Sequence, residues 1–485
     1  MISLEEAKKL AEGYKVVPIS KEILSDIRTP IEVLRILKGV SRHCYMLESM
    51  ENQERWGRYT FLGYDPKMEI TCMNGVMTIR NGSTQTKQVE HPGEAIKELL
   101  KEYTSPKVPG LPTFTGGLVG YFSYDYIKYS EPKLNLDAED VEGFKDVDLM
   151  LFDHVIAFDN LKQKIIVIAN ARTENLEREY ERCQREIEEI LDLIRNGVPT
   201  PVEPGQITSE FRALFSEEEY CSMVERAKKY IYEGDIFQVV LSNRLEADYE
   251  GSLLNTYRHL RTINPSPYMF YFSSDDMEVA GASPETLVKL EDGVLHTFPL
   301  AGTRPRGKTH QEDEALEREL LADEKEKAEH NMLVDLGRND LGKISKFGTV
   351  KVEKYMSIER YSHVMHIGST VAGEIRDENT SLDAVDAVLP AGTLSGAPKI
   401  RAMEIINELE NNKRGIYGGA IGYVDFTGNL DTCIAIRIAY KKNGKVFVRS
   451  GAGIVADSVP ENEYHECINK AKAVMNAVND SREIG

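Results

Sequence analysis

The chain has 485 residues, a length typical of two to four domains, and 41% of them are hydrophobic, enough for a large core. Its formal net charge of −20 disfavours nucleic acids and anionic membrane surfaces as partners. The six cysteines are scattered, and no apolar run reaches the roughly 18 residues that a membrane span needs. The sequence therefore predicts a cytoplasmic protein without a disulfide framework or a zinc ribbon.

The first half of the chain is predicted to consist mainly of strands. β-rich runs separated by Gly, Pro and Asn are found at 43–49, 59–66 and 68–82. Asn74-Gly75 within the last run indicates a tight hairpin turn. A charged amphipathic helix is expected at 173–195. The Pro- and Gly-rich stretch 196–206 is predicted to link an N-terminal half, 1–205, to a C-terminal half, 206–485.

The second half is predicted to alternate strands and helices without regular βαβ spacing. Ser216 and Glu219 form a capping-box pattern, which predicts the start of a helix at residue 217. A strand is expected at 236–247, a meander of strands at 418–453 and a last helix at 461–479. Runs of strands separated by helices in this way are typical of the α+β class, with large antiparallel sheets.

The segment Pro299–Leu341 joins a basic, glycine-punctuated turn to a long acidic pattern that predicts one continuous helix. Glu326 and Glu329 on that helix are three residues apart, and Glu463 and Glu466 repeat the spacing on the last helix. Two such faces meeting would make an all-oxygen site of the kind that Mg²⁺ prefers. In a chain with 79 acidic residues, spacing alone favours the alternative that these carboxylates are solvated helix surface.

Two glycine-rich turns follow predicted strands and could offer backbone N–H groups to a carboxylate. They are Gly302-Thr303 and Gly451-Ala452-Gly453. The alternative is that each is an ordinary turn, which is the commoner case for any single one.

His363, His366 and Arg437 are further candidates for chemistry. The two histidines lie in a β-like run, and alternation places them on opposite faces, so at most one is expected to point into a given site. A neutral histidine can accept a proton, although a structural histidine is commoner. Arg437 lies in the apolar run 433–440, which predicts a continuous strand, and the cost of burying its charge requires a carboxylate from a ligand or from the protein. Composition and spacing alone lead to an α+β protein, possibly a magnesium-assisted enzyme acting on a small anion.

Taken together, these segments resemble the chorismate-utilising enzymes, most closely those of the anthranilate synthase component I type. The motifs that carry the resemblance span nearly the whole chain and are MLES, GRYTFLGYDP, GDIFQVVLS, NPSPYMFYF, GASPE, PLAGTRPRG, EKAEHNMLVDLGRNDLG, YSHVMHIGS, PAGTLSGAPKIRAMEII, IYGGAIGY, IRIAY and RSGAGIVADSVPENEYHEC. The resemblance implies large antiparallel sheets packed as a sandwich with outer helices. It also implies a regulatory N-terminal half, 1–205, and a chorismate-binding catalytic half, 206–485.

The resemblance also implies roles for particular residues. Glu329 and Glu466 are expected to hold Mg²⁺, with Glu326 and Glu463 acting through waters. Glu285 resembles the general acid for a departing hydroxyl, and His366 resembles the base of the later elimination. The expected contacts to chorismate are Gly302, Thr303, Tyr417, Arg437, Gly451, Ala452 and Gly453, and those to an inhibitory tryptophan are Ser49, Pro267, Tyr268 and Met269.

The implied reaction converts chorismate and ammonia to anthranilate and pyruvate through aminodeoxyisochorismate, the first step of tryptophan biosynthesis. Ammonia would come from a separate glutamine amidotransferase subunit, component II, in a feedback-inhibited heterotetramer. Gln238 occupies the position where water-using relatives carry a lysine base, which disfavours isochorismate formation. Ala301 occupies the lysine position of aminodeoxychorismate synthases. These two reactions, and a catalytically silent tryptophan-sensing partner of the amidotransferase, are the alternatives.

Overall fold

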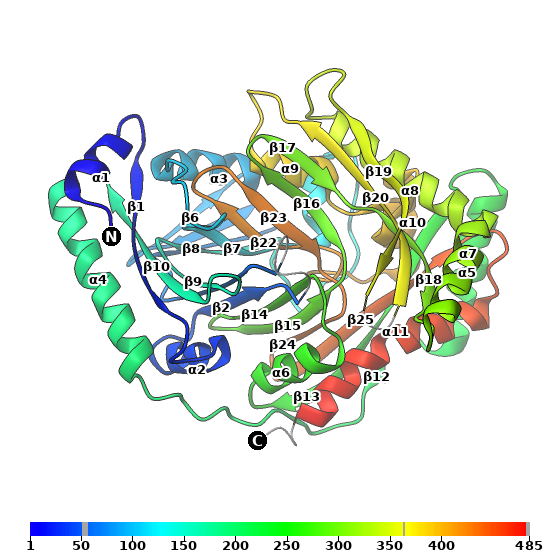
Figure 1. Cartoon of the computed structure of the whole chain (residues 1–485). Helices are drawn as coiled ribbons and strands as arrows, with labels where there is room; N and C mark the ends of the chain where they lie inside the picture. Colours follow the sequence, from blue (N-terminus) through cyan, green and yellow to red (C-terminus); the bar gives the residue numbers. More distant parts are fainter. Residues whose placement is uncertain (51–56, 362–363, 482–485) are drawn as a thin grey trace.

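The computed structural model describes residues 1–50, 57–361 and 364–481, and two antiparallel sheets dominate it (Figure 1). The order of the 13-stranded sheet is β1 (Val16–Leu24), β10 (Lys164–Arg172), β9 (His154–Asp159), β3 (Tyr59–Tyr64), β2 (Cys44–Glu48), β14 (Tyr268–Ser273), β15 (Met277–Ser283), β24 (Ile438–Lys442), β25 (Lys445–Ile454), β13 (Gln238–Glu250) and β11 (Gln206–Ile207), with β12 (Arg212–Ala213) and β21 (Gly396–Ala397) also paired to β13.

The second sheet has 12 strands. Their order is β18 (Leu300–Pro305), β20 (Val364–Glu374), β17 (Val294–Thr297), β16 (Thr286–Glu291), β23 (Leu430–Ile434), β22 (Ala420–Asp425), β7 (Gly117–Phe122), β8 (Val147–Phe152), β4 (Met68–Met73), β5 (Val76–Arg80) and β6 (Thr84–Gln88), with β19 (Lys351–Arg360) paired to β20.

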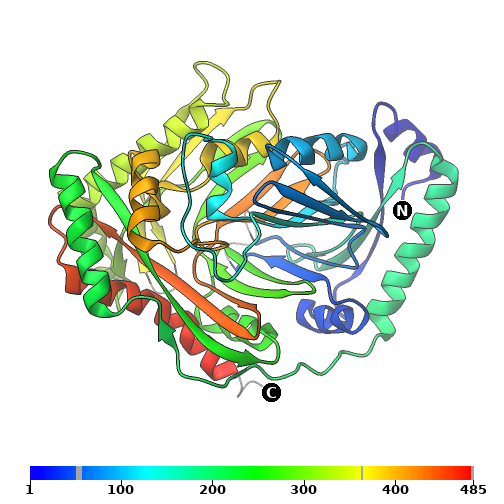
Figure 2. The same cartoon turned by 180° about the vertical axis from the view of Figure 1, so that it is seen from behind.

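Helices pack on the outer sides of the two sheets (Figures 1 and 2). The α-helices are α1 (Leu4–Leu10), α2 (Pro30–Val40), α3 (Pro92–Leu100), α4 (Leu176–Asn196), α5 (Glu217–Tyr232), α6 (Leu254–Ile263), α7 (His310–Ala322), α8 (Glu324–Gly342), α9 (Ser381–Val388), α10 (Lys399–Glu410) and α11 (Pro460–Asp480). Short 3₁₀ helices are η1 (Lys101–Tyr103), η2 (Tyr124–Tyr129) and η3 (Gly392–Leu394). None of the helices in the described ranges is long and apolar enough to cross a membrane.

An aromatic core joins the inner faces of the two sheets. Tyr45 on β2 packs edge-on against Phe152 on β8 with ring centroids 4.7 Å apart, and both side chains are fully buried. On the outer faces, α4 covers β10 and α11 covers β25 of the first sheet, whereas α8 and α9 cover the second. This arrangement confirms the predicted sandwich of large antiparallel sheets with outer helices.

Both sheets combine strands from the two sides of residue 205. β2 pairs with β14 in the first sheet, and β7 pairs with β22 in the second. The segment after α4 contains no helix until α5 and runs along one edge of the molecule, which both views show (Figures 1 and 2). The division into two halves at residue 205 stays a prediction, and the shared sheets mean that the two halves fold around common strands.

Two predicted elements are interrupted in the structure. The acidic pattern at 310–341 is not one helix, because Asp323 ends α7 and caps α8 by accepting hydrogen bonds from the backbone N–H groups of Lys325 and Glu326. The apolar run around Arg437 is not one strand either. β23 belongs to the second sheet and β24 to the first, and Arg437, with a φ of 52°, lies where the chain crosses between them.

A buried ion cluster connects α10, β13 and β25. Glu410 accepts hydrogen bonds from Arg414 at 2.6 Å and from Arg449 at 2.8 Å, and all three side chains are at most 1% exposed. The backbone N–H of Ser242 on β13 also donates to Glu410, at 2.7 Å. Two desolvated guanidinium groups therefore share one carboxylate.

Replacing Glu410 with glutamine is expected to lower the free energy of unfolding by about 3–5 kcal/mol, because two buried cations lose their only anion in this cluster. Denaturant unfolding followed by circular dichroism measures the loss. Glu408→Gln on the same helix is the matched control, since Glu408 is half-exposed and pairs with Arg226 at the surface. Equal, small losses in the two variants would contradict a structural role for the cluster.

Candidate active site

One cavity of about 660 Å³ gathers most of the residues that the sequence singled out. Its walls contain the ends of β13, β15, β18, β20 and β25 together with α8 and α11. The predicted residues that line it are Gln238, Glu285, Gly302, Thr303, Glu326, Glu329, His366, Tyr417, Arg437, Gly451, Gly453, Glu463 and Glu466. Ala452 does not line the cavity, because its side chain faces the opposite way into the apolar cluster beneath α5 and α10.

His366 is held as a neutral imidazole with one defined tautomer. Its Nδ1 lies 2.7 Å from the carbonyl oxygen of Gly302, which can only accept, so Nδ1 carries the hydrogen and Nε2 keeps its lone pair. The hydroxyl of Thr303 is a further neighbour of Nδ1, at 3.2 Å. Burial and the nearby charge of Arg437 lower the pKa of His366. The ring is therefore a base near neutral pH, whereas His363 lies outside the described residues.

Glu285 is a carboxyl that the fold keeps partly protonated at neutral pH. It follows β15 directly, where the Ser283 hydroxyl donates to the carbonyl of Ile434 at 2.7 Å and fixes the strand end. Burial raises the pKa of Glu285 to about 7, while the Thr393 hydroxyl, which donates to it at 3.1 Å, and the charge of Arg437 oppose the shift. Such a group can donate a proton near pH 7.

Arg437 and Tyr417 are buried polar groups of the same cavity. Burial lowers the pKa of Arg437, and the Glu285 carboxyl is the nearest opposing charge. Since the raised pKa of Glu285, about 7, leaves this carboxyl only partly ionised near neutral pH, it neutralises the guanidinium only in part. Burial raises the pKa of Tyr417, so its hydroxyl stays a donor. Together they suit an anionic ligand that supplies the missing negative charge.

The glycines of the cavity wall leave room next to polar side chains. A Cβ on Gly453 would come within 2.7 Å of Nε2 of Gln238, and one on Gly451 within 3.2 Å of the Tyr417 hydroxyl. Gly302 has a φ of 66°, and a Cβ there would lie 3.1 Å from a carboxylate oxygen of Glu326. A side chain at any of these positions would fill the cavity at the point where the polar groups face it.

Four glutamates from α8 and α11 form the acidic wall of the cavity, and their charges are incompletely neutralised. Burial and the neighbouring Glu326 raise the pKa of Glu329, while the amide of Gln238 opposes the shift. Burial also raises the pKa of Glu463, and Glu466 adds to that rise. Lys470 pairs with Glu466 at 2.6 Å. Mutual repulsion of partly buried carboxylates fits a site built for a cation, and an all-oxygen donor set suits Mg²⁺.

The acidic wall does not by itself enclose an ion. Among the described residues, three candidate ligand atoms lie within 4.8 Å of one another at two other places in the molecule and not here. Mg²⁺ binds through one or two carboxylates and takes its other oxygens from waters and substrate. The four glutamates therefore fit a metal whose coordination a ligand completes.

The sequence predictions missed several residues of the cavity wall. Thr393 and Leu394 come from the turn before β21, and Lys325, Lys470 and Arg449 add positive charge. Thr393 lies in the motif PAGTLSGAPK, so its place in a shared motif could have marked it. The residues next to Arg449 in the sequence do not indicate that it lines the cavity, because its position depends on a hydrogen bond to Glu410 from another element.

A second, smaller cavity of about 250 Å³ brings together all four residues predicted to contact tryptophan. Ser49, Pro267, Tyr268 and Met269 line it at one end of the neighbouring strands β2 and β14, in the middle of the first sheet. Asp431 and Cys433 of β23 form the opposite wall, and the Tyr268 hydroxyl donates to Asp431 at 2.8 Å. An apolar cavity with a few polar groups is typical of a small-molecule site.

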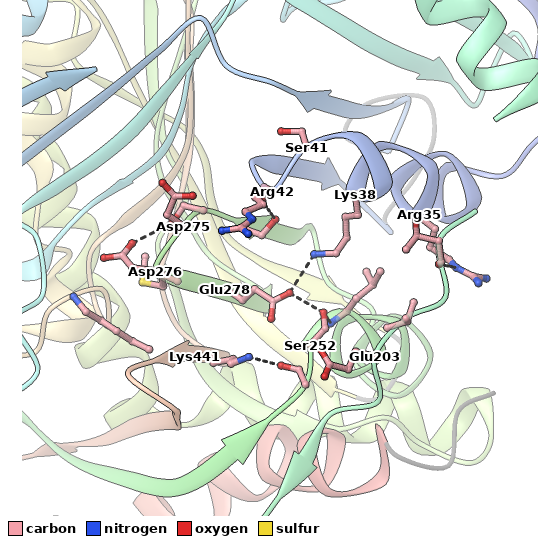
Figure 3. Close-up of a pocket in the computed structure, with 18 of the residues that line it drawn as sticks. Arg35, Lys38, Ser41, Arg42, Glu203, Ser252, Asp275, Asp276, Glu278 and Lys441 are labelled. Carbon is pink, nitrogen blue, oxygen red and sulfur yellow. Dashed lines mark hydrogen bonds and ion pairs between the residues drawn. The ribbon is translucent and has the colours of Figure 1, made fainter. Parts of the chain in front are cut away.

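The widest cavity, about 730 Å³, contains none of the predicted residues (Figure 3). It lies between α2, the β14–β15 turn and the β24–β25 turn. Its charged groups are engaged with one another or with the backbone: Lys38 pairs with Glu278 at 3.3 Å, and Lys441 donates to the carbonyl of Gly251. Cavity volume therefore does not identify the active site. The cavity of about 660 Å³, whose residues have shifted pKa values, is the candidate active site.

Comparison with known proteins identifies the family of the chain. The chain matches the family described as chorismate binding enzyme over residues 42–476. It is 48% identical over 491 residues to anthranilate synthase component 1 of Acetivibrio thermocellus, covering 99% of each chain, and 46% identical over 487 residues to that of Aquifex aeolicus, covering 99% and 98%. The crystal structure of anthranilate synthase component I from Streptococcus pneumoniae superposes with a TM-score of 0.77 at 39% identity, covering 93% of this chain and 98% of the other. With a family match along nearly its whole length, the chain belongs to the chorismate binding enzymes.

Proposed function

We propose that the protein converts chorismate and ammonia to anthranilate and pyruvate, as the names of its relatives indicate for them. The observation that supports this most directly is the pairing in one cavity of an acid, Glu285, with a base, His366. The two groups have opposite protonation states near neutral pH, which a reaction with one protonation and one deprotonation requires.

In the first step, ammonia adds at C2 of the ring and the C4 hydroxyl departs. Glu285 donates its proton to that hydroxyl, which leaves as water, and the new ammonium loses one proton to solvent. Arg437 and Tyr417 would bind the enolpyruvyl carboxylate, because the half-buried guanidinium and the buried hydroxyl of the cavity wall can both donate to it. The Gly302, Gly451 and Gly453 backbones allow close approach of the ring.

In the second step, the aminated intermediate loses pyruvate. Nε2 of His366 accepts the proton on C2, and the C–H electron pair completes the aromatic ring. The C3–O bond breaks, and the enolpyruvate released takes a proton and becomes pyruvate. The hydrogen bond from Nδ1 to Gly302 stabilises the tautomer that leaves Nε2 free for this role.

Glu329 and Glu466 would hold Mg²⁺, with Glu326 and Glu463 acting through waters. When bound, the ion would withdraw electrons from the ring carboxylate as a Lewis acid. The chain's own contribution is to place carboxylates from α8 and α11 on one side of the substrate and Arg437 on the other.

Incubating the purified chain with chorismate, Mg²⁺ and ammonium tests the proposal, with the product identified by chromatography and fluorescence. Anthranilate is expected. Isochorismate would mean that water is the nucleophile, although Gln238 offers no base, and aminodeoxychorismate would mean that the amino group is placed on C4 instead of C2. No product under conditions where chorismate binds would favour a catalytically silent, tryptophan-sensing partner instead.

We propose that ammonia reaches this chain in the cell from a separate glutamine amidotransferase, since its relatives are named as component 1 of a synthase. We also propose that the cavity around Ser49 and Pro267 binds tryptophan as an inhibitor. Its volume of about 250 Å³ and its apolar walls suit an indole, and Asp431 could accept from an ammonium group.

Filling this cavity is expected to relieve inhibition without changing uninhibited turnover. Ser49→Leu adds apolar volume where the ligand would lie, and overpacking costs about 1–3 kcal/mol. The tryptophan concentration for half-inhibition should rise by about tenfold or more, measured by titration in the anthranilate assay. Ser83→Leu, at an exposed turn, is the control and should leave inhibition unchanged. An unaltered tryptophan response in Ser49→Leu would place the inhibitor elsewhere.

A further inference from the structure

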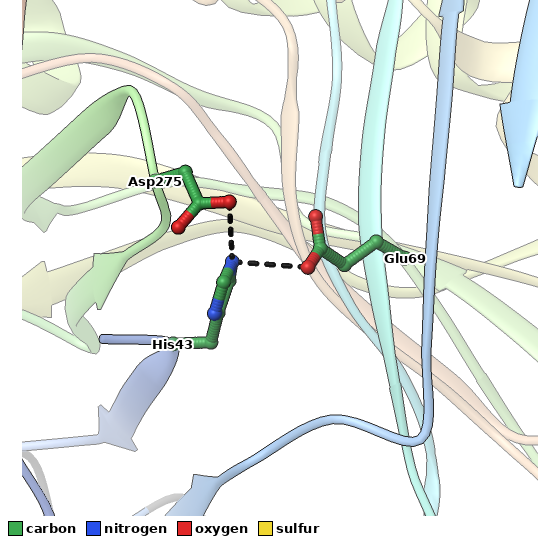
Figure 4. A group of neighbouring side chains, drawn as sticks. All are labelled: His43, Glu69 and Asp275. Atoms are coloured by element: carbon green, nitrogen blue, oxygen red, sulfur yellow. Dashed lines mark ion pairs between the residues drawn. The ribbon is translucent and has the colours of Figure 1, made fainter. Parts of the chain in front are cut away.

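A histidine and two carboxylates from three separate segments meet at the edge of the sandwich, away from both cavities assigned above (Figure 4). His43 immediately precedes β2, Glu69 lies on β4 of the other sheet, and Asp275 lies in the turn between β14 and β15. Nε2 of His43 is 3.0 Å from Oε1 of Glu69 and 3.8 Å from Oδ2 of Asp275. The three ligand atoms all lie within 4.8 Å of one another.

These separations match those of ligands around one metal ion. With bonds of about 2.0–2.1 Å, two ligand atoms are about 3.0 Å apart at a right angle and about 3.4 Å apart at a tetrahedral angle. The 3.0 Å distance from His43 to Glu69 falls within that range, and the 3.8 Å distance from His43 to Asp275 is longer. Asp275 is half-exposed on a turn, so a small side-chain rotation brings its oxygen to the shorter distance.

Among the described residues, the ligand atoms are paired mainly with one another. Nε2 of His43 faces Glu69 at 3.0 Å, and this contact raises the pKa of His43 and lowers that of Glu69, so a metal ion would take the place of the proton between them. The nearest cation to the carboxylates is Arg80, which stays 3.7 Å from Glu69 and 3.8 Å from Asp275. Arg80 is more than half exposed and can move into solvent.

A second group of the same composition shows what a closed ion-pair network looks like. His154 lies 3.0 Å from Glu186 and 3.8 Å from Asp153. There, however, Lys67 donates to Asp153 at 2.7 Å, and Arg182 donates to Glu186. Both carboxylates are engaged by hydrogen-bonded cations, with which a metal ion would have to compete. The contrast singles out the group around His43.

We propose that His43, Glu69 and Asp275 form a binding site for a divalent transition-metal ion of the zinc class. One imidazole nitrogen with two carboxylate oxygens is a donor set that such borderline ions accept, and water would take the remaining position. The ion would link β4 of the 12-stranded sheet to the ends of β2 and β14 in the 13-stranded sheet. This site does not depend on the proposed reaction, and its donors differ from the all-oxygen wall of the active site.

Zinc titration of chelator-treated protein by calorimetry tests the proposal, in excess Mg²⁺ so that the glutamate wall is occupied by a hard ion. One Zn²⁺ per chain is expected. His43→Gln and Asp275→Asn should each weaken Zn²⁺ binding at least about 100-fold, since each removes a ligand. Arg80→Gln should strengthen it several-fold, because a competing charge is lost. Co²⁺ should bind with a visible absorption band that His43→Gln abolishes.

His154→Gln is the matched control and should leave Zn²⁺ binding unchanged. Circular dichroism of Asp275→Asn, on a half-exposed turn, separates lost ligation from lost folding. The proposal is overturned if no stoichiometric Zn²⁺ binds, if binding survives His43→Gln, or if His154→Gln abolishes it.

Discussion

Glu329→Gln is expected to lower anthranilate formation about 1000-fold. The change keeps the shape of the side chain but removes a carboxylate charge from the wall that would hold Mg²⁺. A factor of 1000 corresponds to about 4 kcal/mol of transition-state stabilisation, the range expected of a metal acting as a Lewis acid. Initial rates over a range of Mg²⁺ concentrations measure both the loss and the shift in half-saturating Mg²⁺.

The stability of this variant gives a second readout. Burial and Glu326 raise the pKa of Glu329, so a neutral amide removes a repelled charge and should not lower the free energy of unfolding in the presence of a chelator. Glu324→Gln on the same helix is the control, since Glu324 is exposed and pairs only with Lys327 within the described residues. Turnover of Glu329→Gln within twofold of the unchanged chain would remove this residue from the metal site.

Glu285→Gln is expected to slow turnover by about 100- to 10,000-fold, because the amide cannot protonate the departing hydroxyl. The pH dependence follows from the same group. With its pKa raised to about 7, Glu285 is a proton donor below that pH and loses this capacity as the pH rises through it. Single-turnover rates with bound substrates should therefore show a basic limb that Glu285→Gln lacks.

Thr393→Val tests the assignment of that limb without removing the acid. The Thr393 hydroxyl donates to Glu285 and favours the carboxylate form, so its loss should move the basic limb to higher pH. A limb that stays in place in Thr393→Val, and persists in Glu285→Gln, would belong to another group.

Features set by neighbours in the chain were predictable from the sequence. Asn74 and Gly75 both adopt positive φ, 49° and 78°, as a two-residue hairpin turn between β4 and β5 requires. The Ser216–Glu219 capping box is formed as predicted at the start of α5. All six cysteines are free, as their scattered spacing indicated.

Features that depend on distant contacts were not predictable. The free nitrogen of His366 is decided by the carbonyl of Gly302, 64 residues away. Glu410 lies four residues after Ile406 on the buried face of α10, and only the folded chain brings Arg449 onto it. Most candidate residues of the active site came from long shared motifs, whereas their protonation states required the burial and the neighbours that the structure shows.

The crossing of the chain between the sheets at Arg437 has a consequence for control. Asp431 and Cys433 line the proposed tryptophan cavity, and Arg437, only a few residues further along the same segment, lines the active site. Displacement of this segment by one ligand would carry the guanidinium away from the other. Coupling of this kind is reciprocal, so chorismate would weaken tryptophan binding by the same factor by which tryptophan weakens chorismate binding. The short segment from Asp431 to Arg437, rather than a series of contacting side chains across the sandwich, would then couple the proposed tryptophan cavity to the active site.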